Sequence, residues 1–376
     1  MFGPVLSCLN PSMYRPRTSL FGRHGRTAAA LLAVATVATL GLTGCSNSEK
    51  SGGPVAADTP LPTEIPAGTK LVLADQSERL QSVLRFSGEL DKLPFKVEFA
   101  NFVGGPAVLE AFRAEAADVA SVGDVPPIHA LVAGQDVPII AAYQTSTTAL
   151  RLAVAPGKSI TTLAELKGKK IAYAEGTAQQ AAVLRALDKA GLKPADAQLI
   201  RLQLGEFPDA IRTGQVDVAP LIEPNITRFL RTSGASLIPA DQTKDIYPGL
   251  AYLYARRAVV QDPAKAAATR ALVAAYIRAN QWINTHQDEW ARRYYVENQK
   301  VSAEDAKRIV ESLGTFTFPH LDEQLVARQQ ATIDAIDKAG ELPKKVQAAK
   351  GFDLRFDAPI TEAVTASGAA FAPKER

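Results

Sequence analysis

The stretch from Ala100 to Gly134 constrains the fold more than any other part of the 376-residue chain. It contains a turn with Gly104 and Gly105, a helical run, a short apolar run, and a second Gly/Asp/Pro turn that would begin another helix. Strand-to-helix turns of this kind present free backbone N–H groups near strand ends, where they can hold a polar ligand without a metal. The pattern predicts an α/β fold with a ligand site at those strand ends.

Part of this stretch returns later in the chain. Ala111–Ala120 (AFRAEAADVA) and Ala210–Ala219 (AIRTGQVDVA) are identical at five of ten positions without a gap. Six residues after the shared Asp, each copy has a second acid, Asp124 or Glu223. Chance similarity between Ala-rich segments is one explanation. We favour two lobes that are built on the same strand-and-helix plan and face each other.

The first 45 residues are typical of an export signal rather than of a folded domain. Four arginines between Arg15 and Arg26 precede an apolar, uncharged run at 28–42, which is shorter than the roughly 20 residues of a membrane span. The run ends in Leu42-Thr43-Gly44-Cys45, the pattern of a lipoprotein signal with an acylated Cys. We therefore expect a lipid anchor on Cys45 at the outer face of the cell membrane, with Met1 or Met13 as the start. A transmembrane anchor with an incidental Cys is the alternative.

Cysteine usage and composition agree with this division. Cys8 and Cys45 are the only cysteines, so the mature body would have no disulfide, thiol nucleophile or Cys-ligated metal. Residues 46–68 are rich in Ser, Gly and Pro and lack aromatic residues, which predicts a flexible tether. The chain from Thr69 onward is long enough for a substantial core and two lobes.

Charge and histidine usage exclude several classes of function. The net charge is close to zero once the basic signal region is removed, so no nucleic-acid surface is indicated. The four His are scattered along the chain, which argues against a metal site. We expect no cofactor, and a monomeric body.

Four loops would enter helices at the ends of predicted strands, at 75–77, 101–106, 121–126 and 175–177. A single Gly in such a loop is explained by turn chemistry alone. Four loops together with the repeat favour a site for a carboxylate, sulfonate or similar oxyanion.

The repeated acids complicate this interpretation. If Asp124 and Glu223 face the cleft, they repel a bare anion and favour an amine, hydroxyl or amidine on the ligand; alternatively, each caps a helix. No His, Cys or activating Lys accompanies them in both copies, so a catalytic acid–base pair is not indicated. Tyr143 and Tyr252 are candidate apolar contacts for the ligand.

Five motifs follow one another between Lys70 and Leu230. They are Gly105–Phe112, Asp118–Pro127, Leu163–Lys170, Glu175–Thr177 and Gly214–Ala219 with Glu223-Pro224. In sequence and order they resemble the motifs of the substrate-binding lipoproteins of ABC importers, in the nitrate, sulfonate and taurine branch that also includes binders of thiamine-pyrimidine precursors.

The resemblance implies a two-lobed type II periplasmic-binding-protein fold with the ligand in the cleft between lobes. Residues 69–147 and 251–376 would form lobe 1 and 148–250 lobe 2, with crossovers near 143–154 and 250–257. Carried over by position, with Tyr252 added as an apolar contact, the ligand-binding residues are Gln76, Asn101, Gly104, Gly105, Ser121, Gly123, Asp124, Glu175, Gly176, Thr177, Glu223 and Tyr252. Two positions depart from the family pattern: 75–78 lacks its small-residue cluster, and Ile222 replaces a frequent aromatic residue.

The function implied is capture of a small organic anion, such as an aliphatic sulfonate or taurine, for delivery to a permease and its ATPase. A binder of a heterocyclic vitamin precursor or of nitrate is an alternative in the same class. An enzyme on the same fold is the alternative from another class. The desulfinases that resemble this family use a Cys nucleophile, which the mature chain lacks, so we expect no enzymatic activity.

Overall fold

The computed structural model describes residues 53–56 and 58–373. The expected signal peptide, Cys8 and the lipobox with Cys45 lie outside the described residues, so lipidation stays a prediction.

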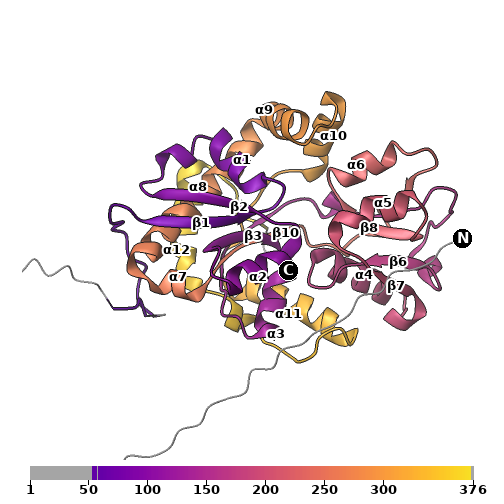
Figure 1. The fold of residues 1–376 in the computed structure, drawn as a ribbon, viewed down its shortest axis with the longest axis horizontal. Coiled ribbons are helices and arrows are strands. Elements are labelled where there is room, and N and C mark those ends of the chain that lie inside the picture. The colour runs from indigo at the N-terminus through magenta and orange to yellow at the C-terminus, as the bar shows by residue number, and fades with distance from the viewer. Residues whose placement is uncertain (1–52, 57, 374–376) are drawn as a thin grey trace, which may run out of the picture. The chain divides into compact units, whose positions relative to one another are not determined.

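The first sheet has five strands in the order β2-β1-β3-β10-β4; Figure 1 labels β1, β2, β3 and β10. Its strands are β1 (Lys70–Asp75), β2 (Lys96–Asn101), β3 (Val119–Gly123), β4 (Ile139–Gln144) and β10 (Leu250–Ala255). β1 pairs in parallel with β2 and β3, whereas β10 runs antiparallel to β3 and β4. Apolar runs such as Ile139–Tyr143, which is buried throughout, suit strands that are covered on both faces.

The second sheet repeats this plan in the order β7-β6-β8-β5-β9. Its strands are β5 (Leu150–Val154), β6 (Lys170–Tyr173), β7 (Gln198–Arg201), β8 (Val218–Ile222) and β9 (Ser236–Leu237). β6 is parallel to β7 and β8, and β5 is antiparallel to β8 and β9. The predicted α/β architecture with two equivalent sheets is confirmed; the residue boundaries of the lobes stay a prediction.

Helices connect and cover the strands. They are α1 (Arg79–Phe86), α2 (Gly104–Arg113), α3 (Pro126–Ala133), α4 (Ala178–Lys189), α5 (Phe207–Arg212), α6 (Asn225–Leu230), α7 (Arg257–Gln261), α8 (Pro263–Thr285), α9 (Gln287–Trp290), a π-helical segment (Ala291–Asn298), α10 (Ala303–Leu313), α11 (Glu323–Lys338) and α12 (Asp357–Ser367). Several of these helices begin with a side-chain cap. Asp262 caps α8 by accepting the Lys265 N–H at 2.8 Å, and Ser302 caps α10 by accepting the Asp305 N–H at 3.2 Å.

The sequence repeat has a structural cause. Its two copies run from α2 into β3 and from α5 into β8. The shared Asp performs the same task in each: Asp118 accepts the Val72 N–H of β1, and Asp217 accepts the Lys170 N–H of β6, both at 2.9 Å. The repeated carboxylate therefore ties β3 to β1 in the first lobe and β8 to β6 in the second.

The chain crosses between the sheets twice. It leaves the first sheet after β4 and enters the second at β5, through 145–149. It returns through 238–249, between β9 and β10. The second crossover was expected near 250–257. That expectation was wrong, because Leu250–Ala255 is already a strand of the first sheet.

The C-terminal helices were expected to pack back onto the first lobe, but two of them also contact the second. From α11, Thr332 accepts a hydrogen bond from Arg185 of α4 at 2.5 Å, and Lys338 pairs with Asp188 of the same helix. From α10, Arg308 donates to Thr227 of α6 at 3.4 Å. Both lobes are therefore held partly by this third segment of the chain.

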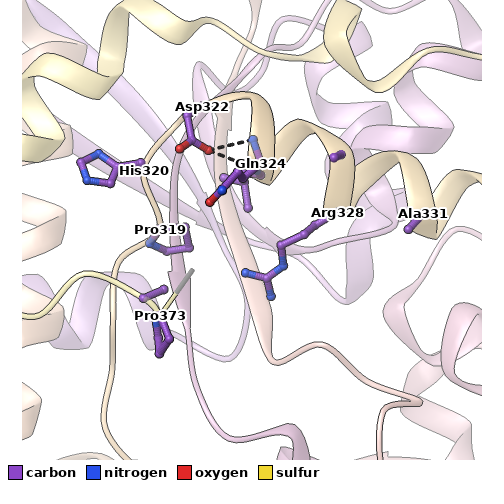
Figure 2. A pocket seen from close by; sticks show the side chains of 10 residues that line it. Pro319, His320, Asp322, Gln324, Arg328, Ala331 and Pro373 are labelled. Atoms are coloured by element: carbon purple, nitrogen blue, oxygen red, sulfur yellow. Dashed lines mark hydrogen bonds between the residues drawn. The ribbon is translucent and has the colours of Figure 1, made fainter. Parts of the chain in front are cut away.

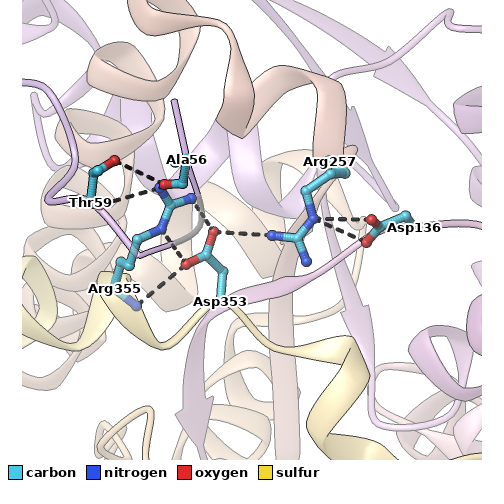
Figure 3. Close-up of polar contacts among 6 residues, drawn as sticks. All are labelled: Ala56, Thr59, Asp136, Arg257, Asp353 and Arg355. Atoms are coloured by element: carbon cyan, nitrogen blue, oxygen red, sulfur yellow. Dashed lines mark hydrogen bonds and ion pairs between the residues drawn. The ribbon is translucent and has the colours of Figure 1, made fainter. Parts of the chain in front are cut away.

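The expected tether at 46–68 ends earlier than its composition suggested. Val55 N–H donates to the Gln261 carbonyl at 2.7 Å, and Leu61 is buried in the core. Figure 3 shows Arg355 donating to the carbonyl oxygens of Ala56 and Thr59 while it pairs with Asp353. The same carboxylate also pairs with Arg257, which contacts Asp136. A polar Pro-rich segment can thus be fixed by its backbone carbonyls, which composition does not reveal.

Candidate ligand-binding site

A cavity of about 650 Å³ lies between the two sheets. On the first lobe it is lined by the loops that follow β1, β2 and β3; on the second, by the residues around Thr177 and Glu223. Thr145 and Tyr247 reach it from the two crossovers, and Tyr294, Tyr295 and Phe316 reach it from the C-terminal segment. The cavity therefore sits where ligands collect in open α/β sheets, outside the carboxyl ends of parallel strands.

Most of the residues expected at the site line this cavity. They are Gln76, Asn101, Gly104, Gly105, Ser121, Gly123, Thr177 and Glu223. The structure places the other four, Asp124, Glu175, Gly176 and Tyr252, outside the lining. Ligand contact by the first group stays a proposal.

Asp124 is fully buried behind the cavity rather than in it. Its Oδ2 lies 3.6 Å from Arg185 Nη2 and accepts a hydrogen bond from Thr332 Oγ1 at 3.4 Å. Gln329 donates to its backbone carbonyl at 2.7 Å. Burial raises the pKa of this carboxyl, and Arg185 opposes the rise. Asp124 thus joins the turn before α3 to α4 and α11. Its neighbours in that turn, Gly123 and Pro126, do line the cavity.

The other three displaced residues also have structural tasks. Glu175 points to solvent and pairs with Arg201. Gly176 donates its N–H to Gln180 Oε1 at 2.9 Å and packs where the two lobes touch: an added Cβ would lie 3.3 Å from Pro106 Cγ. Tyr252 is fully buried in the centre of β10.

The glycines of the cavity wall are required by packing as well as by the turns. A Cβ on Gly105 would lie 2.2 Å from Pro126 Cγ, so with any larger residue at 105 the start of α2 could not pack this closely against the start of α3. A Cβ on Gly123 would lie 3.0 Å from Ala178 Cβ, across the contact between the lobes. Their presence alone is therefore no proof of a ligand.

Glu223 combines the two roles considered for the repeated acids. Its Oε2 accepts the Thr227 N–H at 3.1 Å, in the first turn of α6, while the half-buried side chain lines the cavity. Burial raises the pKa of this carboxyl, and the contacts with Thr227 oppose the rise. No ion pair involves Glu223 in the part of the chain that the structure describes.

The sequence did not single out several residues of the cavity. Arg79, in the first turn of α1, lies among the rings of Tyr143, Trp290 and Phe316, with its guanidinium carbon 4.9, 5.9 and 5.3 Å from their centroids. Its position directly after the strand-end loop at 75–77 could have indicated from the sequence that it lines the cavity. Phe316 offered none, because it joins the cavity from a distant part of the chain.

His129 links the lobes beside the cavity, and we expect acid to weaken this link. Its Nε2 donates to Gln180 Oε1 at 3.1 Å, joining α3 to α4. Burial lowers the pKa of His129 below its ordinary value of 6.5, with the Gln180 hydrogen bond opposing. Because the fold favours the neutral ring, this stabilisation is present above pH 6.5 and is lost as the pH falls toward the lowered pKa. Melting temperatures of wild type and His129→Gln against pH should diverge below that value, with the wild type falling faster; parallel curves would contradict the assignment.

A second, smaller pocket of about 350 Å³ lies at the start of α11 (Figure 2). His320 at its edge stacks on Phe371, with ring centroids 3.9 Å apart, and its Nδ1 lies 3.2 Å from Asp357 Oδ1. These contacts stay within the C-terminal segment, whereas the larger cavity gathers residues from both sheets.

Within residues 53–56 and 58–373, no cluster of three or more His, Cys, Asp or Glu side chains is arranged to hold a metal ion. None of the helices there combines the length and apolarity needed to cross a membrane.

Comparison with known proteins places the chain in a family. Residues 96–290, just over half of the chain, match the family model described as NMT1/THI5 like. The chain is 28% identical over 251 residues to a putative aliphatic sulfonates-binding protein of Escherichia coli (strain K12), covering 67% of this chain and 77% of that protein. A protein of the same description from Bacillus subtilis (strain 168) is 28% identical over 275 residues, with 72% and 80% coverage.

A solved structure shows the same fold. The alkanesulfonate-binding protein SsuA from Xanthomonas axonopodis pv. citri, bound to MOPS, superposes with a TM-score of 0.69 at 23% identity, covering 77% of this chain and 99% of that one. The chain therefore belongs to the NMT1/THI5-like family and has the two-lobed periplasmic-binding-protein fold.

Proposed function

We propose that the protein is the extracytoplasmic substrate-binding component of an ABC importer and that it captures a small organic anion of the sulfonate type. The observation that carries this proposal is the cavity of about 650 Å³ lined by strand-end loops of both lobes. A ligand that contacts both walls interacts better with the closed arrangement of the lobes, so binding would favour closure. The closed form would then dock on a permease with its ATPase.

The relatives support the ligand class. Both curated relatives carry the name of aliphatic sulfonates-binding proteins. The cavity adds hydrogen-bond donors suited to an oxyanion, including the guanidinium of Arg79 and the hydroxyl of Ser121. An export signal with a lipid anchor on Cys45 would hold such a protein at the outer face of the membrane.

The cavity also favours binding over turnover. Among the described residues that line it there is no Cys, so the Cys nucleophile used by the desulfinases that resemble this family has no counterpart there. The rings of Tyr143, Tyr247, Tyr295 and Phe316 at the lining make a heterocyclic vitamin precursor a second candidate ligand.

Ligand-induced thermal stabilisation tests the proposal. At a ligand concentration of about 100 times Kd, binding stabilises the fold by about 2.7 kcal/mol, which corresponds to a rise in melting temperature of about 5 °C. We expect such a rise with at least one sulfonate or with taurine, and none with the same concentration of sodium chloride. A rise in melting temperature only with a pyrimidine or only with nitrate would show that the protein binds that ligand instead of a sulfonate. No rise across the panel would contradict the proposal.

A further inference from the structure

Arg79 is a cation in the cavity wall without a carboxylate partner. It lies in the first turn of α1, directly after the 75–78 loop in which the sequence departs from the family pattern. Its Nη2 donates to Asn280 Oδ1 at 3.0 Å, and no ion pair to Arg79 occurs among the described residues. The flanking rings attract the cation but neutralise no charge. A half-buried cation so placed is stabilised further by an anion that enters the cavity.

The nearest acid does not take that place. Asp75 uses its carboxylate on the start of α1, accepting the N–H groups of Gln76, Leu80 and Gln81 at 2.7 to 2.8 Å. Its oxygens are thus occupied by the backbone. The remaining N–H groups of the Arg79 fork are free to bind two oxygens of one head group, as Arg does with planar or tetrahedral oxyanions.

The charges around the cavity limit the head group to a single negative charge. Arg79 is the only cationic side chain among the described residues lining the cavity, whereas Asp75, Glu78 and Glu223 are acidic. A second negative charge on the ligand would meet this excess of carboxylates without a second cation. A monoanion such as a sulfonate therefore fits better than a dianion such as a phosphonate or sulfate.

Part of the cavity lining is apolar and exposed. Val103 on the first lobe is 71% exposed and Ile222 on the second is 41% exposed, and both line the cavity. Phe102 of the first lobe and Leu204 of the second also line it. Large exposed apolar side chains in the lining of a binding cavity are suited to cover an apolar ligand body.

We propose that Arg79 binds the head group of the ligand and that this ligand is a monoanionic sulfonate with a bulky apolar body, such as an aryl sulfonate. The inference rests on the proposed function and narrows it. It differs from the first expectation of a small sulfonate or taurine, since those compounds would leave the apolar walls in water.

A matched panel and two Arg variants test it by calorimetry on the purified protein. The panel is benzenesulfonate, methanesulfonate and phenylphosphonate, the last at a pH where it is a dianion. Benzenesulfonate should bind at least about tenfold more tightly than either analogue, because its ring buries apolar area and its head carries one charge. Arg79→Gln should weaken benzenesulfonate binding by about 10- to 100-fold. Arg85→Gln, on the exposed side of the same helix, should change nothing.

A structural role for Arg79 predicts different results. If Arg79 only supports its neighbours, Arg79→Gln lowers the melting temperature without ligand and leaves the affinity of the folded protein intact, which would overturn the proposal. Arg79→Lys keeps the charge without the fork; about a tenfold loss of affinity supports the proposal, and no loss argues against it. Equal binding of methanesulfonate or of the phosphonate would refute the ligand class but leave the proposed function standing. If no sulfonate binds at all, the proposed function fails as well.

Discussion

The Gly249→Ala variant is expected to have a free energy of unfolding about 3 to 5 kcal/mol below that of the wild type. Gly249 has a φ of +69°, and a Cβ there would lie 2.2 Å from the carbonyl oxygen of Thr145. Thr145 N–H donates to the Gly249 carbonyl at 2.9 Å, so the two crossovers touch at this point. Neither backbone can retreat without disturbing the pairing of Gln144 with Leu250, which joins β4 to β10.

Gly191 provides a matched control for the steric part of this effect. It has the same φ of +69°, but no atom lies within 4 Å of its added Cβ. Gly191→Ala should therefore cost only the backbone strain, about 1 kcal/mol. Urea unfolding of both variants separates the two contributions. Equal losses would show that the contact between the crossovers does not require Gly at 249.

The second large effect is expected at Asp124. Replacing it by Ala should lower the free energy of unfolding by about 3 kcal/mol, because Arg185 loses its buried partner. The affinities of the folded variant for an amine-bearing sulfonate and for its deaminated analogue should keep their wild-type ratio, since Asp124 lies outside the cavity lining. Denaturant unfolding and calorimetry measure the two results.

Asp124→Asn is the control for the charge. The neutral amide keeps the shape and the contact with Thr332, so Asp124→Asn should lower the free energy of unfolding less than Asp124→Ala does. If either variant selectively loses affinity for the amine-bearing ligand, Asp124 contacts the ligand after all. An Ala variant as stable as the wild type would refute its structural role.

Local patterns predicted the fold well. Alternation of short apolar runs with helical runs, Gly turns and caps depends on neighbours in the chain, and Asp262 and Ser302 cap the helices that directly follow them. The sequence repeat predicted two equivalent sheets. The structure explains the repeat, because the shared Asp118 and Asp217 accept the same backbone hydrogen bond in each sheet. The predicted position of the second crossover was wrong, because the apolar run Leu250–Ala255 is a strand of the first sheet and not the connection that leads to it.

The candidate site was predictable to the extent that strand-end loops define it. Gln76, Asn101 and Ser121 line the cavity because the ends of parallel strands meet at one edge. The side chain of Asp124 in the same turns faces away from the cavity, and only packing against Arg185 shows this.

What the sequence determined by itself is the strand-and-helix plan, its duplication, and the loops that form the cavity walls, since these depend on short-range propensity and periodicity. The tertiary structure alone decided which side chains meet in the cavity. Phe316 and Tyr295 reach Arg79 and its surroundings from more than two hundred residues away, and Leu204 of one lobe approaches Gly104 of the other. Contacts at such separations come from packing two sheets and a C-terminal helical segment together, and no local pattern records them.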